Sequence, residues 1–290
     1  MFNDKYLPTI RAQVETVRKQ YGLDANAPIG DYIFTVLKNE CILLEWPEDK
    51  QLDLDGFSTE KVINGKIETI VYINSAKNKE KQNFCVAHEL GHRYKLDVQI
   101  KDQFPEEIII QSDIEDIMNR FAAELLMPES DFYRRGKESY EKCLEEKEGK
   151  RFIHVKKLIQ AVIQLMDFYF VPYKSVVLRL YEVGIIPKNV NDYLQKIEQT
   201  DDGKDVVALY IKESGITRLR TPDKKKQCSV SLDGIYDIVS KHGIMKYMRD
   251  KELSTFLSDM GYAPEDKMLI EEMRKIELET IEIDKEENRR

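Results

Sequence analysis

Two of the four histidines in this 290-residue chain stand four residues apart, with a glutamate directly after the first. They are His88 and His92, and Glu89 follows His88 in the segment NFCVAHELGHRYKL. Residues i and i+4 of a helix share one face, so both imidazole rings can reach one metal ion about 2 Å away. Glu89 projects about 100° around the helix, beside that ion, where a carboxylate can deprotonate a water. This HExxH pattern predicts a Zn²⁺ site with Glu89 as the general base of a peptidase.

The third metal ligand must come from elsewhere in the chain. Cys85 lies seven residues before His92, about 10 Å along a helix axis, which is too far to share one ion with it. We expect Cys85 to be a small buried core residue instead. Metzincins continue the motif as HExxHxxGxxH, but this chain has Lys95 and Val98 at the last two positions, which excludes that class.

A site with two histidines usually takes a carboxylate as its third ligand. The segment SDIEDIMNRFAAELLMP offers Glu115, Asp116 and Glu124, and spacing alone leaves the choice among them open. Asn119 lies four residues after Glu115 and could hold a metal ligand in place. The competing interpretation is a capping box, in which Ser112 and Glu115 only begin a helix.

The helices and strands that must position these residues are predicted from the spacing of apolar residues and from the positions of turn-forming residues. Short β-branched runs bounded by Pro47, Gly65 and Asn74 predict strands, and apolar residues at helical spacing predict helices. The expected helices are 5–20, 28–40, 78–95 and about 113–127, and the expected strands are 41–46 and 66–74. Together they predict an α+β domain at residues 1–135, in which an extended peptide substrate would pair with the strand at 66–74.

Two further regions follow. Residues 136–150 are rich in charge and predict a solvated connector, and residues 152–183 predict two helices with a helix-turn-helix shape. We therefore expect a helical subdomain at 136–198 and a mixed C-terminal region of unknown role at 199–290. Residues 150–190 carry seven Lys/Arg and two Asp/Glu. This excess of basic residues leaves direct DNA binding open. The simpler interpretation is a helical subdomain that packs on the first domain. His154 and His242 are expected to be ordinary surface or satisfied residues.

Composition narrows the possible partners and location. The formal net charge is −8, which argues against bulk electrostatic binding of nucleic acid. The four cysteines form no CxxC pair, the N-terminal twenty residues are charged throughout, and no apolar run reaches the roughly 18 residues of a membrane span. These features predict a cytoplasmic protein with reduced thiols and no membrane segment.

Two motifs together resemble the ImmA/IrrE family of zinc metallopeptidases. They are AHELGH, residues 87–92, and NRFAAELLMP, residues 119–128. The resemblance covers roughly residues 28–186 and implies a zincin-like fold. It also implies that Glu115, four residues before the asparagine of the second motif, is the third zinc ligand. Met118 departs from the pattern, because the family usually has alanine there.

The resemblance implies a cytoplasmic, zinc-dependent endopeptidase. Its expected substrate is a helix-turn-helix transcriptional repressor, whose cleavage would relieve repression of a mobile element or a stress response. Two other functions stay open. The protein could be a regulator that binds a repressor or antitoxin without cutting it, or it could act as a toxin paired with an antitoxin.

Overall fold

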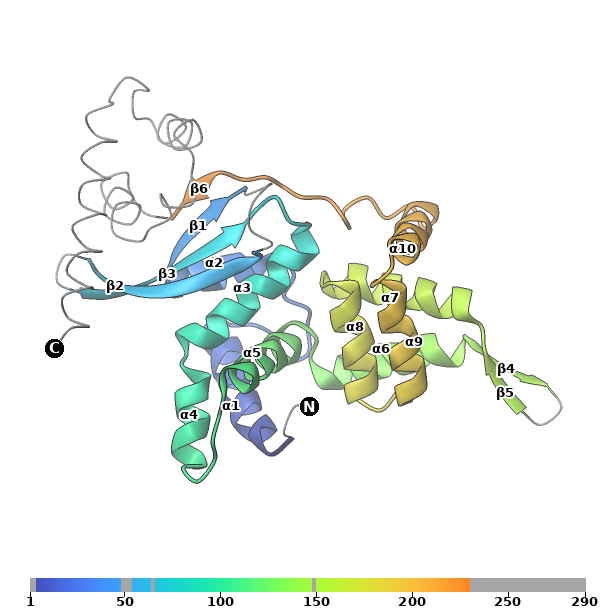
Figure 1. Ribbon diagram of the computed structural model, residues 1–290, viewed down its shortest axis with the longest axis horizontal. Coiled ribbons are helices and arrows are strands. Elements are labelled where there is room, and N and C mark those ends of the chain that lie inside the picture. The colour runs from blue at the N-terminus through green and yellow to red at the C-terminus, as the bar shows by residue number, and fades with distance from the viewer. Residues whose placement is uncertain (1–3, 48–53, 64–65, 148–149, 230–290) are drawn as a thin grey trace, which may run out of the picture.

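The computed structural model describes residues 4–47, 54–63, 66–147 and 150–229, and it combines helices with a small sheet, as the sequence predicts (Figure 1). The helices are η1 (Asp4–Tyr6), α1 (Leu7–Gln20), α2 (Tyr32–Glu40), α3 (Lys79–Arg93), α4 (Leu96–Gln103), α5 (Gln111–Leu126), α6 (Glu129–Glu141), α7 (Val155–Tyr169), α8 (Tyr173–Glu182), α9 (Lys188–Ile197) and α10 (Asp201–Glu213). The strands are β1 (Ile42–Trp46), β2 (Gly56–Ile63), β3 (Lys66–Asn74), β4 (Leu144–Lys147), β5 (Lys150–Ile153) and β6 (Gln227–Cys228).

The larger sheet has the strand order β2-β3-β1-β6. β1 runs parallel to β3, whereas β2 and β6 are antiparallel to their neighbours. The prediction that a substrate would pair with strand 66–74 is wrong, because β3 already has β2 on one side and β1 on the other. In the described part of the chain β2 pairs with β3 alone, so the outer edge of β2 is open to an added strand.

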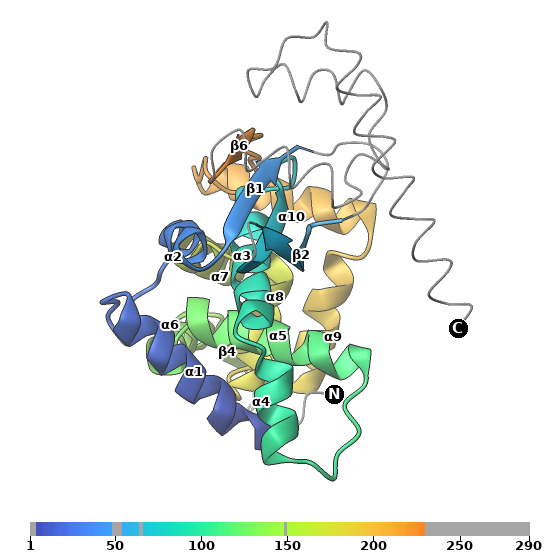
Figure 2. The same ribbon diagram turned by 90° about the vertical axis from the view of Figure 1, so that its left-hand side faces the viewer.

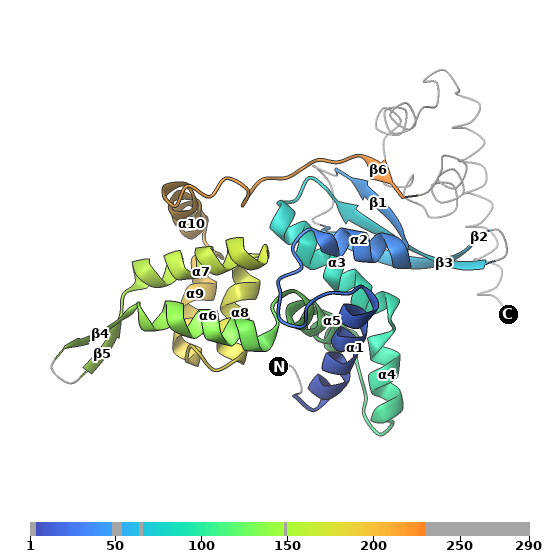
Figure 3. The same ribbon diagram turned by 180° about the vertical axis from the view of Figure 1, so that it is seen from behind.

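Helix α3 lies between the sheet and α5. It contacts β2 and β3 on one side and α5 on the other, while α2 packs against both α3 and β1 (Figure 3). The apolar residues Ala87 and Leu90 of α3 are fully buried, as are Met118 and Phe121 of α5. This shared core fixes the two helices against each other through van der Waals contact and apolar burial.

Helices α6 to α9 form a second group beside the first, with a β4–β5 hairpin at its far end (Figure 1). The described part of the stretch 136–150 is largely solvated, as predicted, but it is not an irregular connector, because it contains the end of α6, strand β4 and the beginning of β5. Gly136 explains part of the difference. A Cβ there would lie 2.7 Å from Ile185 and 3.0 Å from Leu180, so α6 packs closely onto the residues at the end of α8. The boundary predicted at residue 135 falls inside α6.

The helix-turn-helix shape predicted for 152–183 corresponds to α7 and α8, which are bent by 103° with respect to each other. The five apolar residues expected in their core are buried: Leu158, Val162, Leu165, Val177 and Leu180. Among the described helices none is alone both long and apolar enough to cross a membrane.

A strap, residues 216–229, leads from α10 back to the sheet (Figures 1 and 3). Thr221 O accepts a hydrogen bond of 3.1 Å from the backbone N–H of Lys79, and the Lys79 ammonium lies 2.8 Å from the Asp223 carboxylate. At its end the strap forms β6, which covers the β1 edge of the sheet. Of the predicted C-terminal region, residues 230–290 lie outside the described part of the chain.

Candidate metal centre

Helix α3 carries both motif histidines in its C-terminal half. β3 ends at Asn74, whose Oδ1 accepts a hydrogen bond of 3.0 Å from the Ala76 N–H and so forms the turn that leads into α3. Gly91 lets α3 approach α5, because a Cβ at this position would lie only 2.8 Å from Met118 Sδ and 3.1 Å from Phe121 Cδ1. The glycine therefore serves close helix packing, and Met118 fills the contact.

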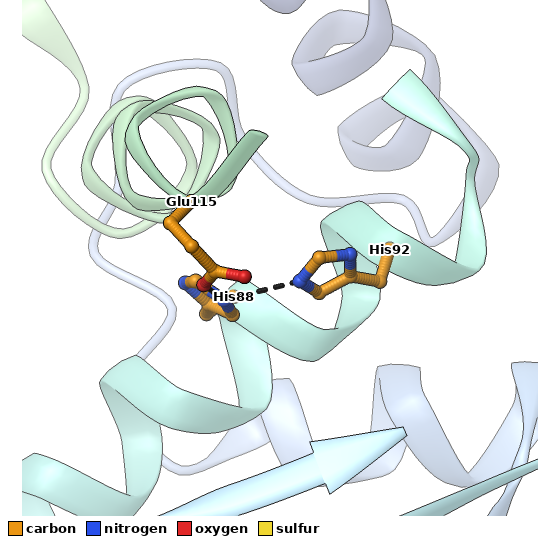
Figure 4. A group of neighbouring side chains, drawn as sticks. All are labelled: His88, His92 and Glu115. Carbon is orange, nitrogen blue, oxygen red and sulfur yellow. Dashed lines mark hydrogen bonds and ion pairs between the residues drawn. The ribbon is translucent and has the colours of Figure 1, made fainter. Parts of the chain in front are cut away.

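His88, His92 and Glu115 converge from α3 and α5 (Figure 4). The two histidine Nε2 atoms are 3.2 Å apart, and His88 Nε2 is also 3.2 Å from Glu115 Oε2. All three candidate ligand atoms lie within 4.8 Å of one another. The structure thus brings together the three residues that the sequence singled out.

The spacing of these atoms fits a tetrahedral zinc ion. Zinc–nitrogen and zinc–oxygen bonds of about 2.0–2.1 Å at tetrahedral angles put neighbouring ligand atoms roughly 3.3 Å apart. The two measured separations, both 3.2 Å, are close to this value. Burial lowers the pKa of His88, with His92 adding to the effect, and burial also lowers the pKa of His92. Both rings are therefore biased toward the neutral form that a metal needs.

Neighbouring side chains hold two of these groups in place. His88 Nδ1 lies 3.0 Å from Asn119 Oδ1, and a proton donated along this contact leaves Nε2 free for a metal. Gln111 Nε2 donates a hydrogen bond of 2.8 Å to Glu115 Oε1. Asn119 has the supporting position that the sequence suggested, whereas Gln111 was not recognised.

Glu89 is buried beside the three converging residues, with 5% of its surface exposed. Burial raises its pKa to about 7; a hydrogen bond with Ser58 opposes the shift, and the charge of Glu115 adds to it. Ser58 belongs to β2, a strand that the sequence analysis missed. A carboxylate with a pKa near neutrality is suited to take and return a proton at physiological pH.

These residues line a cleft of about 950 Å³ between the sheet, α3, α5 and the start of α8. Gly56, Phe57 and Ser58 of β2 form one wall, so the open strand edge borders the candidate metal site. The cleft is large enough for several residues of a polypeptide, because drug-sized ligands occupy roughly 300–1,000 Å³.

The structure removes the other candidate ligands. Cys85 is half-buried and lines the cleft rather than lying wholly in the core, but it is not part of the converging group. The capping-box alternative for Glu115 is wrong, because α5 begins at Gln111 and the Asp113 carboxylate accepts the Ile110 N–H at 3.0 Å. His154 contacts Glu145 at 2.5 Å, on the hairpin side of the second helical group, and His242 lies outside the described residues.

Glu124 belongs to a buried ionic cluster instead. Both of its carboxylate oxygens lie 2.8 Å from the Arg179 guanidinium, and Arg120 and Glu182 complete the cluster. Arg179 is fully buried, so it contributes nothing to a basic surface for DNA. The cluster joins α5 to α8.

A histidine pair and a glutamate beside a buried carboxylate, on helices packed against a small sheet, define a metallopeptidase-like domain. Residues 47–181 match the peptidase family model described as the IrrE N-terminal-like domain. Residues 47–181 therefore form a domain of this peptidase family, which confirms the ImmA/IrrE resemblance seen in the sequence. No curated protein matches the chain significantly.

Proposed function

We propose that this protein is a zinc-dependent endopeptidase in which His88, His92 and Glu115 bind the metal. The observation that carries the proposal is the convergence of these three side chains within 4.8 Å, next to buried Glu89 and an open cleft. Zinc is the preferred ion because two imidazoles and one carboxylate, with one position left for solvent or substrate, are its usual catalytic ligand set.

Bound zinc would supply a Lewis acid that polarises a peptide carbonyl and lowers the pKa of an adjacent water. Glu89 takes the proton of the attacking water and returns it to the leaving amine. Ser58 orients the Glu89 carboxylate, and Asn119 keeps the His88 ring turned toward the metal. The open edge of β2 lies along the cleft, where it can pair with an extended substrate and hold the scissile bond over the site.

We further propose that the substrate is a helix-turn-helix transcriptional repressor in the cytoplasm. The match of residues 47–181 to the IrrE N-terminal-like domain supports this choice, together with a cleft large enough for a polypeptide. A regulator that binds its partner without cleavage is the alternative. Buried Glu89 favours the enzyme, because binding alone needs no carboxylate with a raised pKa beside the metal ligands.

A substrate trap tests this function. Tagged Glu89→Gln, with its metal content checked, is used to capture partners in the native host, and each captured protein is then incubated with wild-type protein. We expect the wild type to produce fragments and Glu89→Gln to be slower by about 10²- to 10⁴-fold. A partner that both proteins bind and neither cuts would support the binding-only alternative.

A further inference from the structure

The segment between α4 and α5 exposes two large apolar side chains beside the cleft. Ile108 is 90% exposed and Ile110 is 57% exposed, whereas Ile109 between them packs against the core. This alternation, with extended backbone at Ile110, places Ile108 and Ile110 on the same outer side of the segment. Isolated exposed isoleucines are common, but two on one face, directly before the cleft-lining residue Gln111, can form a contact surface.

The segment is held in place at several points, so the exposure does not come from a loose loop. The Glu107 carboxylate binds the Tyr6 hydroxyl and the Lys5 ammonium of the N-terminal helix. The ring of Phe104 packs against the ring of Tyr6 at a centroid distance of 5.5 Å. Figure 2 shows the segment running from the end of α4 along the outside of the molecule to the start of α5.

The segment that carries the two isoleucines is predominantly acidic, although Lys101 precedes it and Lys5 pairs with its Glu107. Residues 102–116 contain six acidic residues and no basic one. Asp102, Glu106 and Asp116 are exposed among them. A surface with apolar centres and an acidic surround repels nucleic acid and anionic lipid, and it attracts a basic partner that also has an apolar face.

The position of this surface connects it to the reaction. Ile110 directly precedes Gln111, which lines the cleft and donates a hydrogen bond to Glu115. A polypeptide bound here therefore extends naturally into the candidate metal site.

We propose that Ile108 and Ile110, with Asp102, Glu106 and Asp116 around them, form a docking surface for a basic, amphipathic segment of the protein substrate. This proposal rests on the proposed peptidase function, and it specifies that the substrate carries a basic, amphipathic segment. Segments of this kind are common in proteins that bind DNA, because their Lys and Arg side chains neutralise phosphates. A second copy of this chain is a poor occupant, since the same acidic surface would face itself.

Binding of a synthetic peptide tests the surface separately from cleavage. The probe is a labelled 18-residue peptide of leucine and lysine arranged as an amphipathic helix, with a scrambled peptide of the same composition as its control. Affinity for full-length Glu89→Gln is measured by fluorescence anisotropy at about 50 mM and about 200 mM salt. We expect the amphipathic peptide to bind more tightly than the scrambled one, and more weakly at the higher salt.

Matched variants locate the binding. Replacing Ile108 and Ile110 together by Asp should weaken the peptide roughly tenfold or more, and Glu106→Lys should weaken it severalfold and reduce its salt dependence. Leu209→Asp, at a leucine 52% exposed on α10, and Glu213→Lys make the same kinds of change far from the surface and should leave the affinity unchanged.

Equal losses in the control variants, or an unchanged affinity in the isoleucine variant, would overturn the proposal. So would a shift from dimer to monomer in sedimentation caused by the isoleucine substitutions, which would assign the surface to a second copy. Peptide binding to this surface, with no captured protein cleaved by the zinc-loaded wild type, would uphold the surface and count against the peptidase. If a captured protein is cleaved equally well with and without the isoleucine substitutions, the peptidase function is upheld and the docking surface is wrong.

Discussion

Asn119 determines which nitrogen of His88 faces the candidate metal. Its Oδ1 lies 3.0 Å from Nδ1, so a proton held there leaves the Nε2 lone pair directed toward His92 and Glu115. Asn119 therefore acts on the orientation and the tautomer of the His88 ring. Residues that orient a ligand in this way contribute substantially to the metal affinity of a site.

The first prediction concerns this contact. Asn119→Ala should weaken zinc binding by about 10- to 100-fold while the fold is retained, because His88 loses the group that fixes its ring. Competition with a chelating dye would measure the affinity. Ser112→Ala, an exposed position on the same helix, is the matched control. Equal affinities in both variants would show that Asn119 does not orient the ligand.

At the scale of elements, the site depends on how closely α3 approaches α5. Gly91 and Met118 are complementary across this contact, since a Cβ at Gly91 would approach Met118 Sδ to 2.8 Å. Met118 is fully buried and cannot move into solvent. The long Met118 side chain therefore leaves no room for a Cβ at position 91.

The second prediction follows from this packing. Gly91→Val should lower the free energy of unfolding by about 1–3 kcal/mol, because overpacking in a close-packed core forces side chains off their preferred rotamers. The second change Met118→Ala, in the same protein, should recover part of the loss. Chemical denaturation of the wild type, both single variants and the double variant completes the cycle. Strictly additive losses would mean that the two positions do not share one contact.

Local pattern explains which elements could be predicted. The helix carrying His88 and His92 was predicted because its apolar and metal-binding stripes are both encoded within four turns. β2 was missed because the sequence GFSTEKVI has few apolar residues and gains its structure by pairing along β3. The interior position of β3 was not predictable from its own sequence, because it depends on pairing with both β1 and β2. For this reason the expected pairing of the substrate with β3 was wrong.

At the scale of the whole molecule, a buried ionic cluster joins the peptidase helix α5 to the second helical group. Arg179 and Glu124 come from positions 55 residues apart and pair through two contacts of 2.8 Å. The sequence could offer Glu124 only as a possible ligand, because its partner is brought close by the tertiary fold. Glu115 was assigned through the family resemblance, since spacing alone left the choice among three carboxylates open.

The third prediction concerns the pH dependence of stability. Burial opposes ionisation of Glu124, but Arg179 and Arg120 outweigh it and hold the pKa of Glu124 below its ordinary value of 4.5. A carboxyl group with a lowered folded pKa contributes full stability above its unfolded pKa, and this contribution is lost as the pH falls through the folded pKa. Burial raises the pKa of Glu182 in the same cluster, which gives a dependence of the opposite sign.

Glu124→Gln should therefore lower the free energy of unfolding at pH 7 by about 3–5 kcal/mol, because buried Arg179 loses its two closest charged contacts and, among the described residues, keeps only the one with Glu182 at 3.5 Å. The difference from the wild type should shrink below about pH 4.5. Denaturant titrations at several pH values would measure both effects. Glu138→Gln removes an exposed pair with Arg134 and should change stability by less than about 1 kcal/mol. A constant difference across the pH range would contradict this account of the cluster.

The most direct test of the metal centre is a zinc titration of the purified protein. Wild type and Asp116→Ala should each bind one Zn²⁺ per chain with the same affinity, because Asp116 is exposed and outside the converging group. Glu115→Ala should lose tight binding, because two imidazoles alone leave the coordination incomplete. Equal affinity in Glu115→Ala and Asp116→Ala would contradict the proposed site and the chemistry built on it.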